Sequence, residues 1–200
     1  MRRLLVLFLL LTAHGAAAGQ ACVLVLGDSI SSAYGIDSDR GWVALLQQRL
    51  DRTRPGCSVI NASVSGDTTR TGLNRLPPAL ERYRPEVVIV ELGGNDGLRG
   101  LSLDDIERNL TGIIQLSQQQ GAKVLLTGLR LPPNYGAAYN ARLDAVYQRV
   151  AKNMQVALVA RLLEGIDNRP ALMQDDGVHP NADAQGRILE NLWPKLQPLL

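Results

Sequence analysis

Five short apolar runs alternate with longer stretches in which apolar residues recur at helical spacing. The runs are almost continuous in Val, Leu and Ile, and they cover residues 22–27, 58–63, 86–92, 123–128 and 156–159. This composition is typical of strands that are buried on both faces of a parallel sheet. The alternation therefore predicts an α/β fold in which helices cover both faces of one parallel sheet.

The intervening stretches have the period of amphipathic helices. Ile106, Leu110 and Ile113 follow that spacing, and Ser102 stands where an N-cap is expected, with acidic residues directly after it. A last amphipathic helix is expected from about Asn181. No repeat and no long linker divides the chain, so we expect a single domain.

The first 18 residues have the pattern of a secretory signal peptide. Arg2 and Arg3 form a basic start, Leu4 to Leu11 form an apolar stretch, and Ala16 to Ala18 form a small-residue cleavage site. An apolar stretch of about eight residues is too short to span a bilayer. We therefore expect cleavage near Ala18, a domain formed by residues 19–200, and a periplasmic or secreted protein without a stable membrane anchor.

The charge of the expected mature chain excludes two classes of partner. The full chain has 21 basic and 19 acidic side chains, and loss of Arg2 and Arg3 brings the formal net charge from +2 to zero. A neutral chain without a basic cluster is not expected to bind nucleic acid or an anionic membrane surface. The chain also has no exposed heptad pattern that would favour assembly, so we expect a monomer.

Cys22 and Cys57 each stand at the start of an expected strand, and these strands could be neighbours. Export would permit a disulfide between them. Two buried thiols fit the sequence equally well. Two cysteines and the single mature histidine cannot form a four-ligand zinc site without carboxylates, so no metal is expected.

Ser29 follows the apolar residues Val23 to Leu26 with only Gly27 and Asp28 between them. This arrangement predicts a strand that ends in a sharp turn and holds Ser29 at the carboxyl edge of the sheet, where α/β folds bind ligands. Ser29 fits both a helix N-cap and a nucleophile. The surrounding residues do not form the Gly-x-Ser-x-Gly pattern of α/β-hydrolases.

A base for such a serine is found near the end of the chain. Once the leader is removed, His179 is the only histidine, and histidine can accept a serine proton near neutral pH. Asp176 precedes it by three residues with Gly177 between, a spacing that lets a carboxylate fold back onto Nδ1. Asp175 is the competing carboxylate, and a plain surface turn is the competing interpretation.

Two polar turns follow the second and third expected strands and open onto the same edge as Ser29. Gly66 lies in the first turn and Asn95 in the second. A backbone N–H at Gly66 and the Asn95 side-chain amide could stabilise negative charge on a carbonyl oxygen, as acyl transfer requires. In isolation, without Ser29, Asp176 and His179 elsewhere in the chain, both segments would be interpreted as tight turns with no role in catalysis.

The chain resembles the SGNH (GDSL) hydrolase family. The family's characteristic blocks are matched, in this order, by Ser29, Gly66, Asn95 and the Asp176-x-x-His179 pair. The resemblance spans the chain from residue 24 to 180 and implies a three-layer α/β/α sandwich with a five-stranded parallel sheet of flavodoxin-like order 2-1-3-4-5. Ile30 departs from the family pattern, which more often has leucine there, and residues 160–172 are not distinctive.

The resemblance also implies a mechanism without metal or cofactor. Ser29 would attack an ester or thioester carbonyl, His179 would take its proton, and Asp176 would orient the imidazole. The backbone N–H groups of Ser29 and Gly66 and the Asn95 amide would bind the oxyanion. Small-molecule acyl substrates such as acyl-CoA thioesters, lysophospholipids and aryl esters are expected, and the expected contacts with the acyl chain are Leu98, Leu101 and Leu131.

Two alternatives remain open from the sequence. A carbohydrate O-acetylesterase could use the same residues on the same scaffold. A non-catalytic binder of fatty acids or lipids is an alternative of a different class, but it would not require Ser29, Asn95, Asp176 and His179 together.

Overall fold

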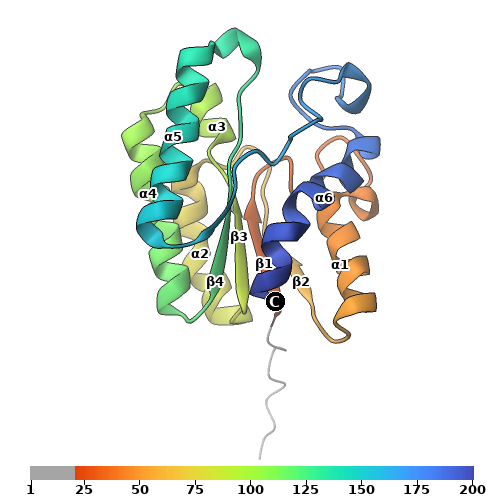
Figure 1. The fold of residues 1–200 in the computed structure, drawn as a ribbon. Helices are drawn as coiled ribbons and strands as arrows, with labels where there is room; N and C mark the ends of the chain where they lie inside the picture. The colour runs from red at the N-terminus through yellow and green to blue at the C-terminus, as the bar shows by residue number, and fades with distance from the viewer. Residues whose placement is uncertain (1–20) are drawn as a thin grey trace, which may run out of the picture.

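A computed structural model describes residues 21–200, and the expected signal peptide lies outside this range. Its centre is one parallel sheet with the strand order β2-β1-β3-β4-β5 (Figure 1). This order confirms the expected fold. The strands are β1 (Val23–Gly27), β2 (Val59–Asn61), β3 (Val87–Glu91), β4 (Lys123–Thr127) and β5 (Ala157–Val159).

Six α-helices accompany the strands of the described chain. They are α1 (Trp42–Thr53), α2 (Thr69–Tyr83), α3 (Gly94–Leu98), α4 (Leu103–Gln119), α5 (Ala137–Met154) and α6 (Gln185–Leu196). Figure 1 shows α1 and α6 on one side of the sheet and α2, α4 and α5 on the other. None of the helices in residues 21–200 is both long and apolar enough to cross a membrane.

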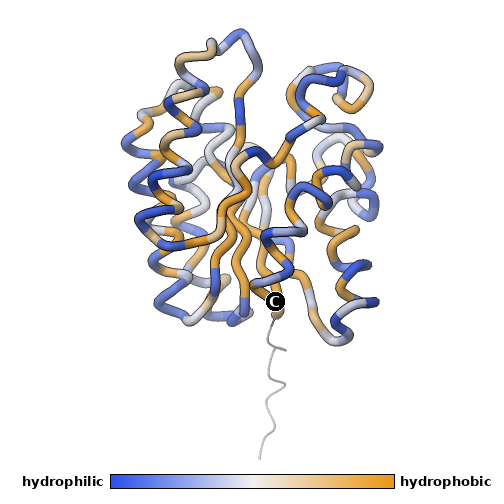
Figure 2. Tube along the Cα trace, viewed as in Figure 1, coloured by the Kyte–Doolittle hydropathy of each residue, from blue (hydrophilic) through white to orange (hydrophobic). Residues whose placement is uncertain are grey.

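The sheet separates two apolar cores because alternate side chains of a strand point to opposite faces. In β1, Val23 and Val25 pack with α1 and α6, whereas Leu24 and Leu26 pack with α2, α4 and α5. All five residues of β1 and of β3 are buried. Figure 2 shows these strands as a hydrophobic centre between helices whose outer faces are hydrophilic.

The observed element boundaries differ slightly from the expected ones. β2 and β5 are only three residues long, since they are the two edge strands and pair on one side only. Ser102 caps α4 by accepting a hydrogen bond from the backbone N–H of Asp104, as expected. The last helix begins at Gln185 rather than near Asn181, because a short 3-10 turn capped by the Asn181 side chain precedes it.

Cys22 and Cys57 form a disulfide, which resolves the alternative that the sequence left open. Their Cα atoms are 5.1 Å apart, within the usual range for a disulfide. The bond joins the residue before β1 to the loop before the edge strand β2, so it ties the sheet's outermost strand to its centre.

Loss of this disulfide should destabilise the domain. The two cysteines are 35 residues apart, and closing a loop of that length in the unfolded chain corresponds to about 4 kcal/mol. We expect a Cys22→Ser/Cys57→Ser variant to lose a free energy of unfolding of this order in urea titrations. Addition of a reductant should lower the stability of the wild type towards that of the variant and leave the variant unchanged; equal stability of the two oxidised proteins would contradict this role.

Candidate active site

Ser29 lies in a sharp turn directly after β1. The Asp28 carboxylate accepts a hydrogen bond from the backbone N–H of Ile30 at 3.1 Å, which closes the turn. Gly27 is required at the end of the strand, because a Cβ there would lie 2.6 Å from Ser31 Oγ and 2.8 Å from Glu91 Oε2. The turn therefore holds Ser29 in one position, with only 9% of its surface exposed.

Ser29, His179 and Asp176 form one line of hydrogen bonds. Nε2 of His179 lies 2.9 Å from Ser29 Oγ, and Nδ1 lies 2.6 Å from Asp176 Oδ2. The other Asp176 oxygen accepts the backbone N–H groups of Val178 and His179, both at 2.9 Å. The ring of His179 thus pairs with Asp176 and not with the neighbouring Asp175.

These contacts keep Asp176 ionised. Burial raises the pKa of the carboxyl, but the hydrogen bonds from His179 and Val178 outweigh burial and lower the pKa to about 2. With an anion at Nδ1, the ring carries its proton there and leaves Nε2 free to accept from Ser29. This arrangement can turn a serine hydroxyl into a nucleophile.

Tyr34 is a neighbour of the triad that sequence reasoning did not identify. Its ring centroid lies 4.7 Å from that of His179, tilted by 43°. The side-chain amide of Gln174 donates to the Tyr34 carbonyl at 2.8 Å, which ties this loop to the His179 loop. An isolated tyrosine in a polar loop gives no sequence signal, and only the fold places it against the imidazole.

Asn95 lies in the first turn of α3, after β3. Its amide nitrogen donates one hydrogen bond to Asp28 Oδ2 at 3.0 Å, and the residue lines the same pocket as Ser29 and His179. Gly93 precedes α3 with a φ of 114°, where a Cβ would lie 2.3 Å from Tyr147 Oη. The glycine thus allows the turn before α3 to pass directly against the Tyr147 hydroxyl of α5.

Gly66 lies in the turn after β2, also with a positive φ of 82°. This turn is tied to the Ser29 turn, because the backbone N–H of Val64 donates to the Gly27 carbonyl at 3.1 Å and the hydroxyls of Ser32 and Ser65 are 2.8 Å apart. The Gly66 carbonyl accepts from Arg99 Nη2 at 2.9 Å. Gly66 is not part of the pocket lining, but its turn lies at the same edge of the sheet.

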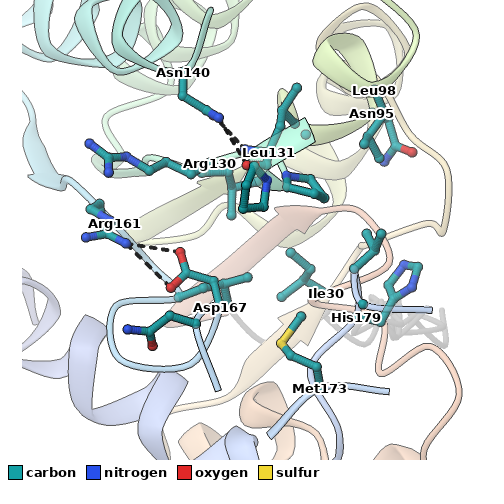
Figure 3. A pocket seen from close by; sticks show the side chains of 18 of the residues that line it. Ile30, Asn95, Leu98, Arg130, Leu131, Asn140, Arg161, Asp167, Met173 and His179 are labelled. Atoms are coloured by element: carbon teal, nitrogen blue, oxygen red, sulfur yellow. Dashed lines mark hydrogen bonds and ion pairs between the residues drawn. The ribbon is translucent and has the colours of Figure 1, made fainter. Parts of the chain in front are cut away.

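A pocket of about 560 Å³ opens beside Ser29 and His179. Leu98 and Leu131 line it, as expected for contacts with an acyl chain, together with Ile30 and Met173 (Figure 3). Leu101 does not line it and is 42% exposed. Two of the three leucines singled out from the sequence are therefore brought to the pocket, and the third is not.

The far end of the pocket is polar. Figure 3 shows Arg161 paired with Asp167 on the side away from Asn95 and His179, and the pair measures 3.1 Å. Asn140 holds the Leu131 backbone from both sides, accepting its N–H at 2.8 Å and donating to its carbonyl at 3.1 Å. Residues 160–172, which had no distinctive pattern, thus supply part of this wall.

No metal site accompanies this arrangement in the part of the chain that the structure describes. Within residues 21–200, no group of three or more His, Cys, Asp or Glu side chains is placed to hold a metal ion.

The depressed pKa of Asp176 predicts a specific pH dependence of stability. The pKa falls from the usual 3.8 to about 2 in the folded chain, so the ionised carboxylate favours folding above about pH 4 and this contribution disappears as the pH falls through about 2. The difference in unfolding free energy between the wild type and Asp176→Asn should therefore shrink over that range in urea titrations. Asp175→Asn removes a neighbouring charge and is the matched control; a difference for Asp176→Asn that is independent of pH would contradict the assignment.

The chain was compared with known proteins. The GDSL-like Lipase/Acylhydrolase family matches residues 25–187. Esterase TesA of Pseudomonas aeruginosa is 50% identical over 96% of this chain and 94% of its own length. Thioesterase 1/protease 1/lysophospholipase L1 of Escherichia coli (strain K12) is 44% identical over 97% of this chain and 91% of its own length. A crystal structure of TesA superposes with a TM-score of 0.88 at 50% identity, over 90% of this chain and 100% of that one. The chain therefore belongs to the GDSL-like lipase/acylhydrolase family, also called the SGNH hydrolases.

Proposed function

We propose that this protein is a serine hydrolase that cleaves ester and thioester bonds of acyl substrates through an acyl-enzyme intermediate. The observation that carries the proposal is the line from Asp176 through His179 to Ser29, with 2.6 Å and 2.9 Å between the bonded atoms, at the mouth of a largely apolar pocket. A non-catalytic lipid binder would need the pocket but not this line of hydrogen bonds.

The first half of the reaction transfers the acyl group to the enzyme. Ser29 Oγ attacks the carbonyl carbon while His179 Nε2 takes the hydroxyl proton, and the carbonyl oxygen becomes negatively charged. The Asn95 amide and the backbone N–H groups of Ser29 and Gly66 bind this oxygen in our proposal. His179 then gives its proton to the leaving alcohol or thiol as the carbonyl forms again.

The second half of the reaction releases the acid. A water molecule gives its proton to His179 and attacks the acyl-enzyme, and the proton then returns to Ser29 Oγ. In both halves, Asp176 stabilises the imidazolium because its carboxylate stays ionised next to Nδ1. The tilted ring of Tyr34 lies beside the imidazole, with 4.7 Å between the ring centroids.

The pocket favours an acyl chain longer than acetate. A volume of about 560 Å³ with Leu98, Leu131, Ile30 and Met173 in its lining offers far more apolar space than an acetyl group fills. The names of the relatives, which include an esterase and a thioesterase/lysophospholipase, fit the same substrate class. We therefore prefer acyl esters, acyl thioesters and lysophospholipids to the acetylated carbohydrates of the alternative reading.

We also infer that the protein is exported and loses residues 1–18. The basic, apolar and small-residue pattern of that segment supports this inference. The Cys22–Cys57 disulfide adds independent support, because disulfides persist mainly in oxidising compartments such as the periplasm. A monomeric state stays a prediction.

Ser29→Ala should abolish hydrolysis of p-nitrophenyl esters, because no other group replaces the attacking oxygen. We expect a loss on the order of 10⁴-fold or more in kcat/KM, with an unchanged circular dichroism spectrum. Covalent labelling by a fluorophosphonate should disappear in the same variant.

Ser38→Ala is the matched control for this experiment. Ser38 lies in the exposed 3-10 turn Ser38–Arg40, and its side chain has no hydrogen bond with the other described residues. This variant should be labelled and remain active. Near wild-type turnover by Ser29→Ala would disprove the assignment of the nucleophile, and an unlabelled wild type would favour the binder.

Activity should rise with the length of the acyl chain. Each methylene that enters the apolar part of the pocket contributes about 0.8 kcal/mol, or about fourfold in kcat/KM. A series of nitrophenyl esters from acetate upward should show this rise and then a plateau where the chain reaches Arg161 and Asp167. Leu131→Ala should reduce kcat/KM for long esters more than for acetate. Leu101→Ala is the control and should leave this ratio unchanged. A preference of the wild type for acetate alone would favour the O-acetylesterase.

A further inference from the structure

Glu91 is a fully buried acid at the end of β3 that the mechanism above does not use. Its side chain has no exposed surface, and it faces the Ser29 turn rather than the pocket. Oε2 accepts the backbone N–H of Asp28 at 3.2 Å and the Ser31 hydroxyl at 2.6 Å. Oε1 is also buried and meets no donor among the described residues. An ionised carboxylate would leave this second oxygen desolvated and unpaired, which is strongly unfavourable.

A second buried carboxyl lies against it. Asp28 is 2% exposed, and its two oxygens accept the Ile30 backbone N–H at 3.1 Å and the Asn95 amide at 3.0 Å. The backbone N–H of Asp28 already donates to Glu91 Oε2, so the two carboxyl groups belong to one buried turn. A hydrogen bond between two carboxyl groups requires that one of them keeps a proton. The contacts decide which one: Asp28 accepts two N–H groups, whereas Glu91 has an oxygen without a donor.

We propose that Glu91 keeps its proton at neutral pH and donates a hydrogen bond to the Asp28 carboxylate, so that Asp28 remains the fixed acceptor that orients the Asn95 amide. Glu91 is then a positioning residue, since it acts on the oxyanion site through Asp28 and touches no substrate. The role of Asn95 in this proposal rests on the proposed function. The protonation state of Glu91 is independent of that function.

The charges around the pair favour the same assignment. Burial raises the pKa of Glu91 well above its usual value, and the neighbouring negative charge of Asp28 raises it further. Burial also raises the pKa of Asp28, but hydrogen bonds from Ile30 and Asn95 limit it to about 6. These directions agree with the contacts, which place the negative charge on Asp28 and the proton on Glu91.

The other titratable groups around the pair come from three elements. Tyr147 of α5 donates its hydroxyl to the Leu92 carbonyl at 2.9 Å, and burial raises the pKa of this phenol well above its usual value. Asp96 of α3 is held by the Thr69 hydroxyl at 2.6 Å and the Thr69 N–H at 2.8 Å. His179, from the loop before α6, interacts electrostatically with Asp28. None of them supplies a donor to Glu91 Oε1.

Substitution of Glu91 by glutamine and by leucine tests whether the protonated or the ionised carboxyl group is required. Glutamine has the shape of a protonated glutamate, so it can accept from Asp28 N and Ser31 Oγ with its oxygen and donate to the Asp28 carboxylate with its amide. Glu91→Gln should keep kcat within about threefold of the wild type. Glu91→Leu should lower kcat about 10-fold or more with little change in KM, because oxyanion donors act on the transition state.

A double-mutant cycle tests whether Glu91 acts through Asn95. In an Asn95→Ala background, Glu91→Leu should cost less than about threefold, since the group that it positions is gone. A full additional loss in that background would assign Glu91 a general structural role and overturn the proposal. Loss of activity in Glu91→Gln, with the fold intact, would overturn it as well, because it would show that the negative charge is required.

Carbon-13 NMR tests the proton directly in the wild-type protein, even if Glu91→Leu does not fold. The side-chain carboxyl signal that disappears in Glu91→Gln should have the shift of a protonated acid at neutral pH. A carboxylate shift at neutral pH would overturn the proposal. Ser29→Ala provides the separate control: if it stays active, the proposed function fails, and the NMR result still decides the state of Glu91.

Discussion

The in-register pairing of β1 with β3 is the interaction on which the rest of the structure depends. Parallel pairing places Gly27 opposite Glu91, so both strands end at the same level. The turns that follow therefore start side by side, one with Ser29 and the other with Asn95. A shift by one residue would reverse which side chains face each core and would separate the Ser29 turn from Glu91.

The two apolar cores hold this register. Each strand of the centre is buried on both faces, with Val23 and Val25 against α1 and α6 and Leu24 and Leu26 against the opposite helices. α6 follows the loop that carries Asp176 and His179, with one short 3-10 turn between them. Because the same helix is part of the core, burial of its apolar side chains fixes the end of that loop relative to Ser29, although about 150 residues separate the two ends of the hydrogen bond.

The residues around Ser29 are constrained by the side chains that pack against them. Gly27 and Gly93 leave no room for a Cβ, since Ser31, Glu91 and Tyr147 occupy that space. Asp28 and Glu91 remain buried beside each other, where two charges would be unfavourable. Replacement of any of these residues would therefore disturb its packed neighbours as well as the residue itself.

The sequence was sufficient to predict the sheet, its helices and the order of the site residues along the chain, because hydrophobic period and motif spacing are local properties of the chain. It left the disulfide between Cys22 and Cys57 open, and it gave no sign of Tyr34 beside the imidazole or of Arg161 and Asp167 in the pocket wall. Leu101 illustrates the same limit, since it lies outside the pocket that Leu98 and Leu131 line. These points depend on contacts between segments that are far apart in the chain. They follow from the packing of the sheet and its helices, because hydrophobic period does not encode such distances.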